Sequence, residues 1–211
     1  MVKKDKQLNK VKKSLNNLVN SPLYQYRSEN NYQPVVGQGS MDAKVMFIGE
    51  APGEKEALSG IPFCGASGRI LDELLASIDL DRDTVYITNV VKDRPPKNRD
   101  PKADEIALYT PFLKQQIKII KPLVVATLGR FAMEFMFNNF NNDLEIITKG
   151  KKSGQVKLPK ISDARAQSFN LEGESGESFI LLPLYHPAVA LYNPNKKTEL
   201  LADFKKLQDL I

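Results

Sequence analysis

Apolar residues along this chain follow two alternating patterns. Four short segments consist mostly of consecutive apolar residues, which is typical of strands buried on both faces. They lie at 44–48, 84–88, 123–127 and 179–183. Elsewhere apolar residues recur every three or four positions, the spacing of an amphipathic helix. This spacing predicts helices at about 67–78, 102–120, 130–138 and 196–210.

This alternation predicts the fold class. Apolar strands that alternate with helices pair in parallel, and the helices then cover both faces of one sheet. We therefore predict an α/β protein with a mostly parallel central sheet in a three-layer α/β/α arrangement. The length of 211 residues suits a single domain that spans 1–211.

Three segments lie outside this pattern. Apolar residues at helical spacing among lysines and asparagines predict an amphipathic N-terminal helix at about 3–19. Prolines and glycines interrupt 20–42, which we expect to be loop. Residues 149–177 are polar, rich in serine, glycine and lysine, and without periodicity, so we expect a flexible insertion there.

Three unusual loops follow predicted strands. Their sequences are GEAPG at 49–53, NVVKDRPPKNR at 89–99 and YHPAVAL at 185–191. In open α/β sheets, ligands bind beyond the carboxyl ends of the strands. We therefore expect the three loops to converge on one crevice.

Composition narrows the class of protein. With 42% apolar and 26% charged residues, the chain has the composition of an ordinary soluble globular protein. No segment approaches the roughly 18 apolar residues of a membrane span, and the lysine-rich N-terminus lacks the apolar stretch of a signal peptide. We expect a cytoplasmic protein with no membrane partner. The net charge of +5 suits a polyanionic partner, although a solvated basic surface explains it equally well.

The chain has one cysteine, Cys64, and one histidine, His186. A single cysteine cannot form an internal disulfide or a cysteine-built metal or iron–sulfur site within one chain, so we predict no metal. Cys64 as a nucleophile with His186 as its base is one alternative, but a lone cysteine is more often a packing residue. The common nucleotide-binding glycine motifs are absent, although the backbone of GEAPG is able to hold a phosphate.

Two side chains at strand ends suit recognition of a nucleic-acid base. The amide of Asn89 offers a donor and an acceptor for a base edge, although a turn cap is the commoner role. His186 precedes Pro187, which restrains the backbone, and a functional imidazole or an ordinary histidine is equally consistent with this position. The loop after Asn89 also carries a basic rim typical of sites that hold single-stranded or flipped nucleotides, or simply solvated charge. Its basic residues are Lys92, Arg94, Lys97 and Arg99.

Four motifs occur in a fixed order: G-E-A-P-G, P-F-x-G-x-[AS]-G, N-V-V-K-x-R-P-P-x-N-R and H-P-A. Each motif alone is weak, but together they resemble the family-4 uracil-DNA glycosylases. The resemblance covers about 43–129 and resumes from about 179 to the C-terminus. It implies a doubly wound α/β/α fold and an enzyme that cleaves the glycosidic bond of uracil in DNA, leaving an abasic site.

The resemblance also implies roles for individual residues. Phe63 stacks on the flipped uracil, Asn89 pairs with its Watson–Crick edge, and His186 hydrogen-bonds the O2 atom that gains charge as the base leaves. Glu50, with the backbone of Ala51 and Gly53, lines the site and places the water. Leu191, or less well Ala190, wedges into the duplex. The expected partner is uracil-containing DNA, single- or double-stranded, bound by a monomer.

The chain departs from the family at several positions. Typical members carry four cysteines that bind a four-iron four-sulfur cluster, and none of the corresponding positions is a cysteine here. They read Leu18, Ser21, Asp93 and Tyr109. We therefore predict no cluster and no other cofactor, with packing in its place. Ala57 also replaces an acidic residue usual after the glycine loop.

Two other functions stay open at this point. The same fold can excise another base, such as hypoxanthine, xanthine or a modified pyrimidine. A catalytically silent DNA-binding member of the superfamily is the second, although binding alone does not require Phe63, Asn89 and His186 together.

Overall fold

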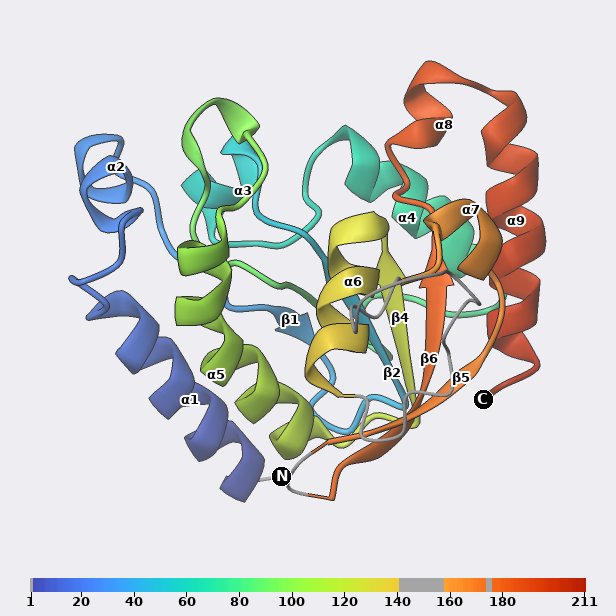
Figure 1. Ribbon diagram of the computed structural model, residues 1–211, viewed down its shortest axis with the longest axis horizontal. Helices are drawn as coiled ribbons and strands as arrows, with labels where there is room; N and C mark the ends of the chain where they lie inside the picture. The colour runs from blue at the N-terminus through green and yellow to red at the C-terminus, as the bar shows by residue number, and fades with distance from the viewer. Residues whose placement is uncertain (1, 141–157, 174–175) are drawn as a thin grey trace, which may run out of the picture.

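The computed structural model describes residues 2–140, 158–173 and 176–211. Within them lies one six-stranded sheet with the strand order β1-β3-β2-β4-β6-β5 (Figure 1). The strands are β1 (Gln38–Gly39), β2 (Val45–Gly49), β3 (Tyr86–Asn89), β4 (Val124–Leu128), β5 (Phe169–Glu172) and β6 (Ser178–Leu184). The four strands predicted from the apolar segments are the four central ones.

The central strands pair in parallel, and only the short edge strands β1 and β5 run antiparallel to their neighbours. The prediction of a mostly parallel sheet is thus confirmed. The pairing of β2 with β3 places Gly49 opposite Asn89 at the carboxyl ends of both strands. Two of the three unusual loops therefore start side by side.

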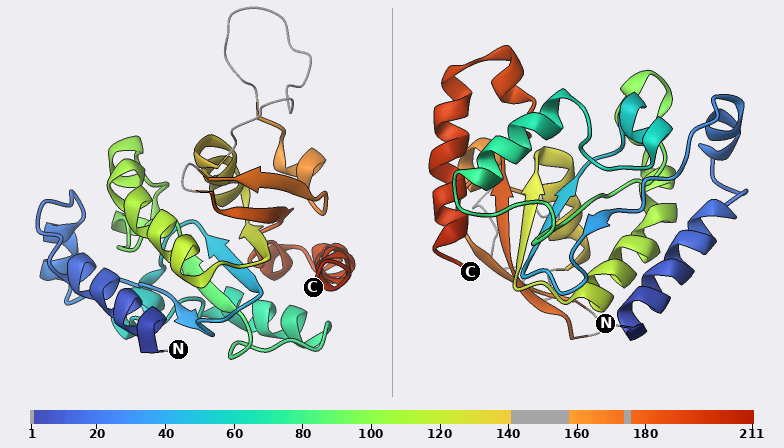
Figure 2. Two further views of the ribbon diagram at one scale, coloured as in Figure 1. Left: turned by 90° about the horizontal axis from the view of Figure 1, so that it is seen from below. Right: turned by 180° about the vertical axis from the view of Figure 1, so that it is seen from behind.

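Helices cover both faces of the sheet (Figure 2). On one face, residues of α1 (Val2–Asn16), α5 (Ala103–Ile120) and α6 (Arg130–Asn139) pack into one buried cluster with the sheet. On the other, α4 (Ala66–Ala76) and α9 (Asn195–Gln208) pack into a second cluster. This confirms the three-layer prediction. None of the described helices is long and apolar enough to cross a membrane.

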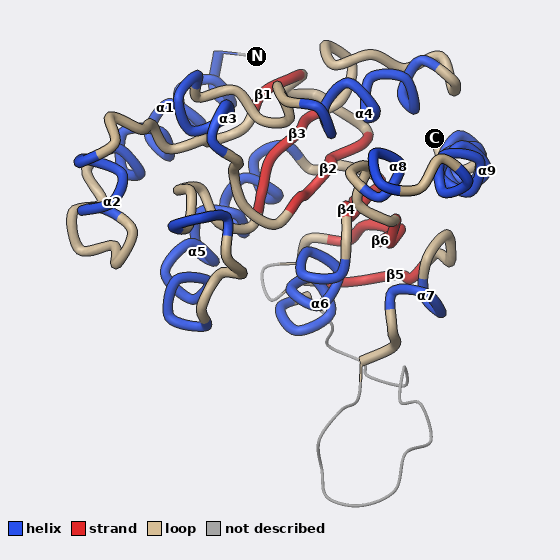
Figure 3. Tube along the Cα trace, turned by 90° about the horizontal axis from the view of Figure 1, so that it is seen from above, coloured by secondary structure: helices blue, strands red, loops and turns tan. Residues whose placement is uncertain are grey.

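Short helices join these elements and surround the carboxyl end of the sheet. They are α2 (Tyr24–Glu29), α3 (Glu54–Ser59), the 3-10 helix at Pro96–Asn98, α7 (Ile161–Ala164) and α8 (Val189–Tyr192). Seen from above, α3 and α8 lie on either side of the ends of β2 and β3 (Figure 3). The expected loop at 20–42 is wrong in part, because it contains α2 and β1. A helix of one or two turns is too short for its apolar spacing to be recognised.

The predicted flexible insertion at 149–177 needs correction over part of its length. Residues 149–157 lie outside the described residues. From residue 158 the segment carries α7 and then β5, which pairs antiparallel with β6. Leu171 of β5 is buried against the core. Side chains on one face of an edge strand pack against the core, so Leu171 is buried although the surrounding sequence is polar.

A buried polar network ties the N-terminal segment to the layer beneath it. The Asp93 carboxylate accepts hydrogen bonds from Tyr109 at 2.6 Å and from Arg27 at 3.1 and 3.2 Å. The hydroxyl of Ser21 lies 2.8 Å from that of Tyr109. Arg27 also donates to the backbone carbonyls of residues 15 and 16, at the end of α1. All four side chains are at most 6% exposed, so this network joins α1, α2, α5 and the loop after β3.

Replacing Arg27 by alanine should destabilise the fold strongly. The Asp93 carboxylate would stay buried without its cation, and breaking a buried pair in this way costs about 3–5 kcal/mol. Urea denaturation measures the change in the free energy of unfolding. As a control, Lys197→Ala breaks the exposed ion pair with Glu73 and should cost less than about 1 kcal/mol. Similar losses in the two variants would show that the buried network adds no stability.

Candidate active site

The residues of the expected crevice come from the ends of β2, β3 and β6 and from the loop between α3 and α4, at the carboxyl edge of the sheet. Gly49 is the last residue of β2. A Cβ atom on Gly49 would lie 2.3 Å from Oδ1 of Asn89 and 2.8 Å from the ring of Phe63. Only a residue without a side chain lets Asn89 and Phe63 approach the backbone this closely.

The side-chain amide of Asn89 carries an unused donor. Asn89 is 1% exposed, and its Nδ2 atom has no hydrogen-bond partner among the described residues. A buried donor without a partner costs about 1–3 kcal/mol. Such a group is expected where a ligand supplies the missing acceptor.

His186 lies beside Phe63, with the two ring centroids 5.6 Å apart and the planes tilted by 30°. Its Nδ1 atom accepts a hydrogen bond from the backbone N–H of Ala188 at 3.2 Å. A neutral imidazole that accepts at Nδ1 carries its proton on Nε2. Burial lowers the pKa of His186 to about 4, so at neutral pH the side chain is an uncharged donor.

The backbone of Phe63 is held in an unusual conformation. Its φ of 52° lies in the left-handed region, which is costly for an aromatic residue. The Glu56 carboxylate accepts its N–H, and the Arg82 guanidinium donates to its carbonyl oxygen. A Cβ atom on Gly68 would lie 1.7 Å from that oxygen. Glu56, Arg82 and Gly68 together orient the ring.

Sequence reasoning missed Glu56. One of its carboxylate oxygens accepts the N–H of Phe63 and the other accepts the N–H of Gly53. Gly53 is the N-cap of α3, and a glutamate three residues later is the spacing of a capping box, so this signal was present. The neighbouring Ala57, noted as a departure, is fully buried. The acidic group that supports the glycine loop is therefore Glu56.

Glu50 is half-buried next to the crevice. Its pKa is raised to about 7, first by burial and then by the nearby Asp100 charge, against an opposing effect of Arg130. The residue also borders a small cavity of about 150 Å³ between α5 and α6, which polar side chains such as Glu134 and Asn138 line. This space is large enough for water.

The glycine loop and the loop after β3 are joined through their backbones. The N–H groups of Val90 and Val91 donate to the carbonyls of Gly49 and Glu50 at 2.9 and 3.0 Å. Ala51 is partly buried against the core beside them. The structure thus brings together Glu50, Ala51, Phe63, Asn89 and His186, whereas the Gly53 N–H is already bonded to Glu56.

The four basic residues of the loop after β3 differ in their surroundings. The prediction that Lys92 contacts DNA is wrong, because its side chain is fully buried. The Arg94 side chain is 9% exposed and contacts Tyr32, Glu54 and Asn98. The Arg99 guanidinium forms two bonds with Glu105.

Lys97 is exposed at the tip of the same loop. Both Lys97 and the following Asn98 have a positive φ, and Arg94 holds the Asn98 side chain. The internal bonds of the two arginines therefore shape a tight turn that presents Lys97. Contacts of Lys97, Arg94 and Arg99 with DNA stay predictions.

Helix α8 follows His186 directly and exposes two large side chains. Leu191 is 44% exposed and Tyr192 is 87% exposed, whereas Ala190 packs partly against the core. The position of Leu191 suits the predicted wedge better than that of Ala190. Tyr192 was missed, because exposure at the end of a four-residue helix leaves no mark in the sequence.

The cysteine-hydrolase alternative finds no support in this geometry. Cys64 is exposed, and its Sγ atom lies 3.4 Å from the hydroxyl of Ser59. Phe63 is the residue that lies beside His186. In the part of the chain that the structure describes, no three His, Cys, Asp or Glu side chains gather as a metal site.

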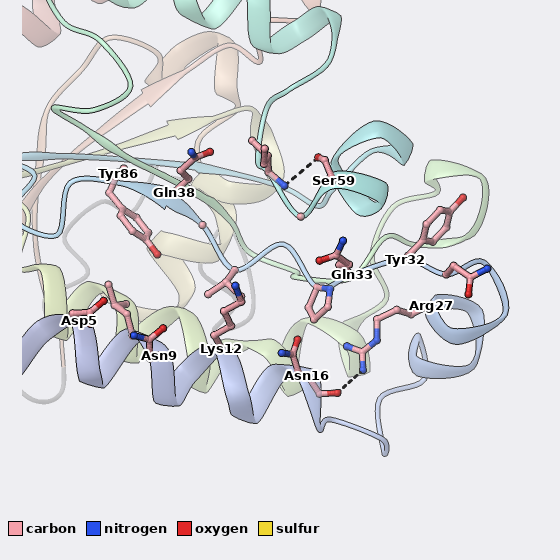
Figure 4. Close-up of a pocket in the computed structure, with 18 of the residues that line it drawn as sticks. Asp5, Asn9, Lys12, Asn16, Arg27, Tyr32, Gln33, Gln38, Ser59 and Tyr86 are labelled. Atoms are coloured by element: carbon pink, nitrogen blue, oxygen red, sulfur yellow. Dashed lines mark hydrogen bonds between the residues drawn. The ribbon is translucent and has the colours of Figure 1, made fainter.

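A larger groove, of about 880 Å³, lies elsewhere between α1, α2 and the segment leading to β1 (Figure 4). Amide side chains such as Asn9, Asn16 and Gln33 point into it, and Arg27 closes one end through its bond to the carbonyl of Asn16. Neither Asn89 nor His186 lines it. The unpartnered donor of Asn89 therefore lies outside this groove.

Comparison with known sequences shows the superfamily of the chain. A sequence model of the uracil DNA glycosylase superfamily matches residues 36–208. The chain belongs to this superfamily.

Individual relatives identify the family of the chain within this superfamily. The chain is 41% identical to a type-4 uracil-DNA glycosylase of Sulfurisphaera tokodaii over 204 residues, which cover 96% of this chain and 84% of the relative. A type-4 uracil-DNA glycosylase of Archaeoglobus fulgidus is 42% identical, with 88% and 84% covered. One from Thermotoga maritima is 35% identical, with 86% and 85% covered. The chain is therefore a member of the type-4 uracil-DNA glycosylase family, as the motifs predict.

A side chain at Gly49 should disrupt the crevice more than the fold. In Gly49→Ala the new methyl group must displace Asn89 or Phe63, and misplacement of about 1 Å costs roughly 10²-fold in rate. Single-turnover cleavage of a uracil-containing oligonucleotide measures this loss. Gly65→Ala is the matched control, because no atom lies within 4 Å of its added Cβ. Equal activity of the two variants would contradict the assigned geometry.

Proposed function

We propose that the chain flips uracil out of DNA into this crevice and hydrolyses its N-glycosidic bond, leaving an abasic site for base excision repair. The unpartnered Nδ2 donor of Asn89, beside Phe63 and His186, is the observation that carries the proposal. Uracil offers an oxygen acceptor at O4 to such a donor. Its flat ring suits the face of a fixed aromatic side chain.

Binding of the flipped base depends on Phe63 and Asn89. Stacking on an aromatic side chain contributes about 1–3 kcal/mol per base. Nδ2 of Asn89 donates to O4, and Oδ1 accepts from the ring N3–H. Cytosine carries an amino group where uracil carries O4, so it would place a donor against Nδ2 and leave that donor without an acceptor.

His186 acts on the leaving group. As the glycosidic bond breaks, the bond electrons move to the base and negative charge develops at O2. Nε2–H of neutral His186 donates to that oxygen, and this hydrogen bond strengthens as the charge grows. A cationic imidazole is not required, which agrees with the lowered pKa of His186.

Glu50 places the water that attacks the sugar carbon. The positive charge on the sugar reduces the need for a strong base, so orientation of the water is the main requirement. Glu50 also borders a cavity with room for a water molecule. The backbone of Ala51 completes this side of the site.

Exposed side chains around the site contact the DNA strand. Lys97 meets a phosphate, and Leu191, together with Tyr192, fills the space that the flipped base leaves. The DNA substrate of the proposed reaction is single- or double-stranded. We propose that the protein acts as a monomer.

The iron–sulfur cluster of typical family members does not fit the residues present here. Three of its four positions, Ser21, Asp93 and Tyr109, are hydrogen-bonded to one another in a buried network, and the fourth is Leu18. A hydroxyl, a phenol and a carboxylate are not the thiolate donors that such clusters take. We propose that this network replaces the cluster as the tie between the same elements.

The same fold acting on another base is the second candidate. Nδ2 of Asn89 is a donor that needs an acceptor on the base. This favours uracil, which has O4 at that position, over bases that carry an amino group there. Hypoxanthine and xanthine carry an oxygen at the corresponding edge, and oligonucleotides with these bases are the controls for specificity.

Replacement of His186 should separate chemistry from binding. His186→Ala should lower the single-turnover rate by about 10²–10³, the cost of removing one oxyanion donor. Binding to DNA with an uncleavable uracil analogue should change little. Phe63→Ala should weaken that binding as well as the rate, because stacking acts already before the bond breaks. Wild-type cleavage by His186→Ala would contradict the mechanism, and no cleavage of any base by the wild type would favour a silent binding protein.

The rate should rise with pH through the pKa of Glu50. Because this pKa is raised to about 7, the carboxylate that orients the water is mostly protonated at pH 6 and mostly ionised at pH 8. The single-turnover rate should therefore increase by roughly tenfold over that range. His186 stays neutral throughout and does not contribute. Glu50→Gln should be slower and should lose the rise; a wild-type profile in Glu50→Gln would exclude the assigned role.

A further inference from the structure

Lys92 is a buried amine whose hydrogen-bond partners are all neutral. Its Nζ atom lies 2.7 Å from Oγ1 of Thr88, 2.6 Å from the backbone oxygen of Asn89 and 2.6 Å from Oε1 of Gln116. The side chain is fully buried. Among the described residues, no carboxylate lies within ion-pair distance of Lys92.

The surrounding bonds show that Lys92 donates three times. The hydroxyl of Thr88 donates to the carbonyl of Val36 at 2.7 Å, so its oxygen accepts from Lys92. Gln116 uses its Nε2 on the same carbonyl and on Tyr86, which leaves Oε1 as the acceptor. Three acceptors match the three N–H groups of an ammonium, whereas a neutral amine has only two. Burial lowers the pKa of Lys92 well below its usual value, and these three acceptors favour the charged form.

The Lys92 amine contacts the backbone of a residue of the proposed uracil site. The carbonyl that Lys92 holds belongs to Asn89, whose side chain carries the unpartnered donor of the crevice. Exposed charges are screened by solvent, but a buried charge acts over a longer distance. A positive charge near the base, with no counter-ion beside it, would stabilise negative charge on the departing uracil.

We propose that Lys92 acts in uracil excision as a positioning residue for Asn89 and as a fixed positive charge that stabilises the departing uracil anion. The inference rests on the proposed function, because it concerns the same leaving group. It gives Lys92 a role in the interior of the protein, whereas the position of this residue in the basic loop suggests a contact with a DNA phosphate. It also explains why the buried cation has amide and hydroxyl partners only, since a carboxylate beside it would cancel its field.

Lys92→Met is the first test, because methionine has similar length but neither charge nor N–H donors. A unit charge at about 10 Å with an effective dielectric constant of about 20 changes a rate by roughly tenfold. We expect a single-turnover loss of that size or more on uracil, with binding to an uncleavable uracil analogue changed less than the rate. The loss should be smaller on 5-fluorouracil, whose anion is intrinsically more stable. Equal losses on the two bases, or none, would overturn the charge role.

A second pair of variants keeps Lys92 and decides the question if Lys92→Met does not fold. Gln116→Glu and Gln116→Met both remove the donor to Val36, but only the glutamate adds a negative charge beside Nζ. The proposal expects Gln116→Glu to be slower than Gln116→Met on uracil, with a smaller gap on 5-fluorouracil. A methionine variant as slow as the glutamate variant overturns it. Failure of the wild type to cleave uracil would instead refute the proposed function, and with it this inference.

Discussion

The crevice depends on the close approach of two neighbouring strands at Gly49. Because β2 ends in a residue without a side chain, Asn89 and Phe63 can both lie against its backbone. The carbonyls of Gly49 and Glu50 then bind the N–H groups that follow Asn89. The close approach at Gly49 therefore places the Asn89 amide and the Phe63 ring beside each other.

Three residues of the site, Phe63, His186 and Asn89, are also held by hydrogen bonds from groups around them. Glu56 and Arg82 hold the backbone of Phe63, the Ala188 N–H holds the ring of His186, and Lys92 holds the backbone of Asn89. Groups held in this way need little reorganisation when charge develops in the reaction. The precision of the site comes from these outer partners as much as from the residues that face the base.

The sequence predicts the central strands and long helices because their apolar spacing extends over enough residues. The motifs identify the family and the loops that meet at the crevice. What could not be predicted is the direction of each side chain in a loop. Lys92 and Lys97 lie five residues apart on one basic loop, yet Lys92 is buried because acceptors from β3 and α5 meet it there. These acceptors depend on tertiary packing, as do the partners of Arg94 and Arg99.

The network of Arg27, Asp93, Tyr109 and Ser21 changes what the scaffold depends on in the cell. A scaffold joined by metal–sulfur bonds requires a supply of iron and sulfide during assembly and is open to attack by oxygen. Hydrogen bonds and an ion pair form from the chain alone as it folds. The contacts by which this network holds the N-terminal segment therefore need neither iron nor sulfide to form.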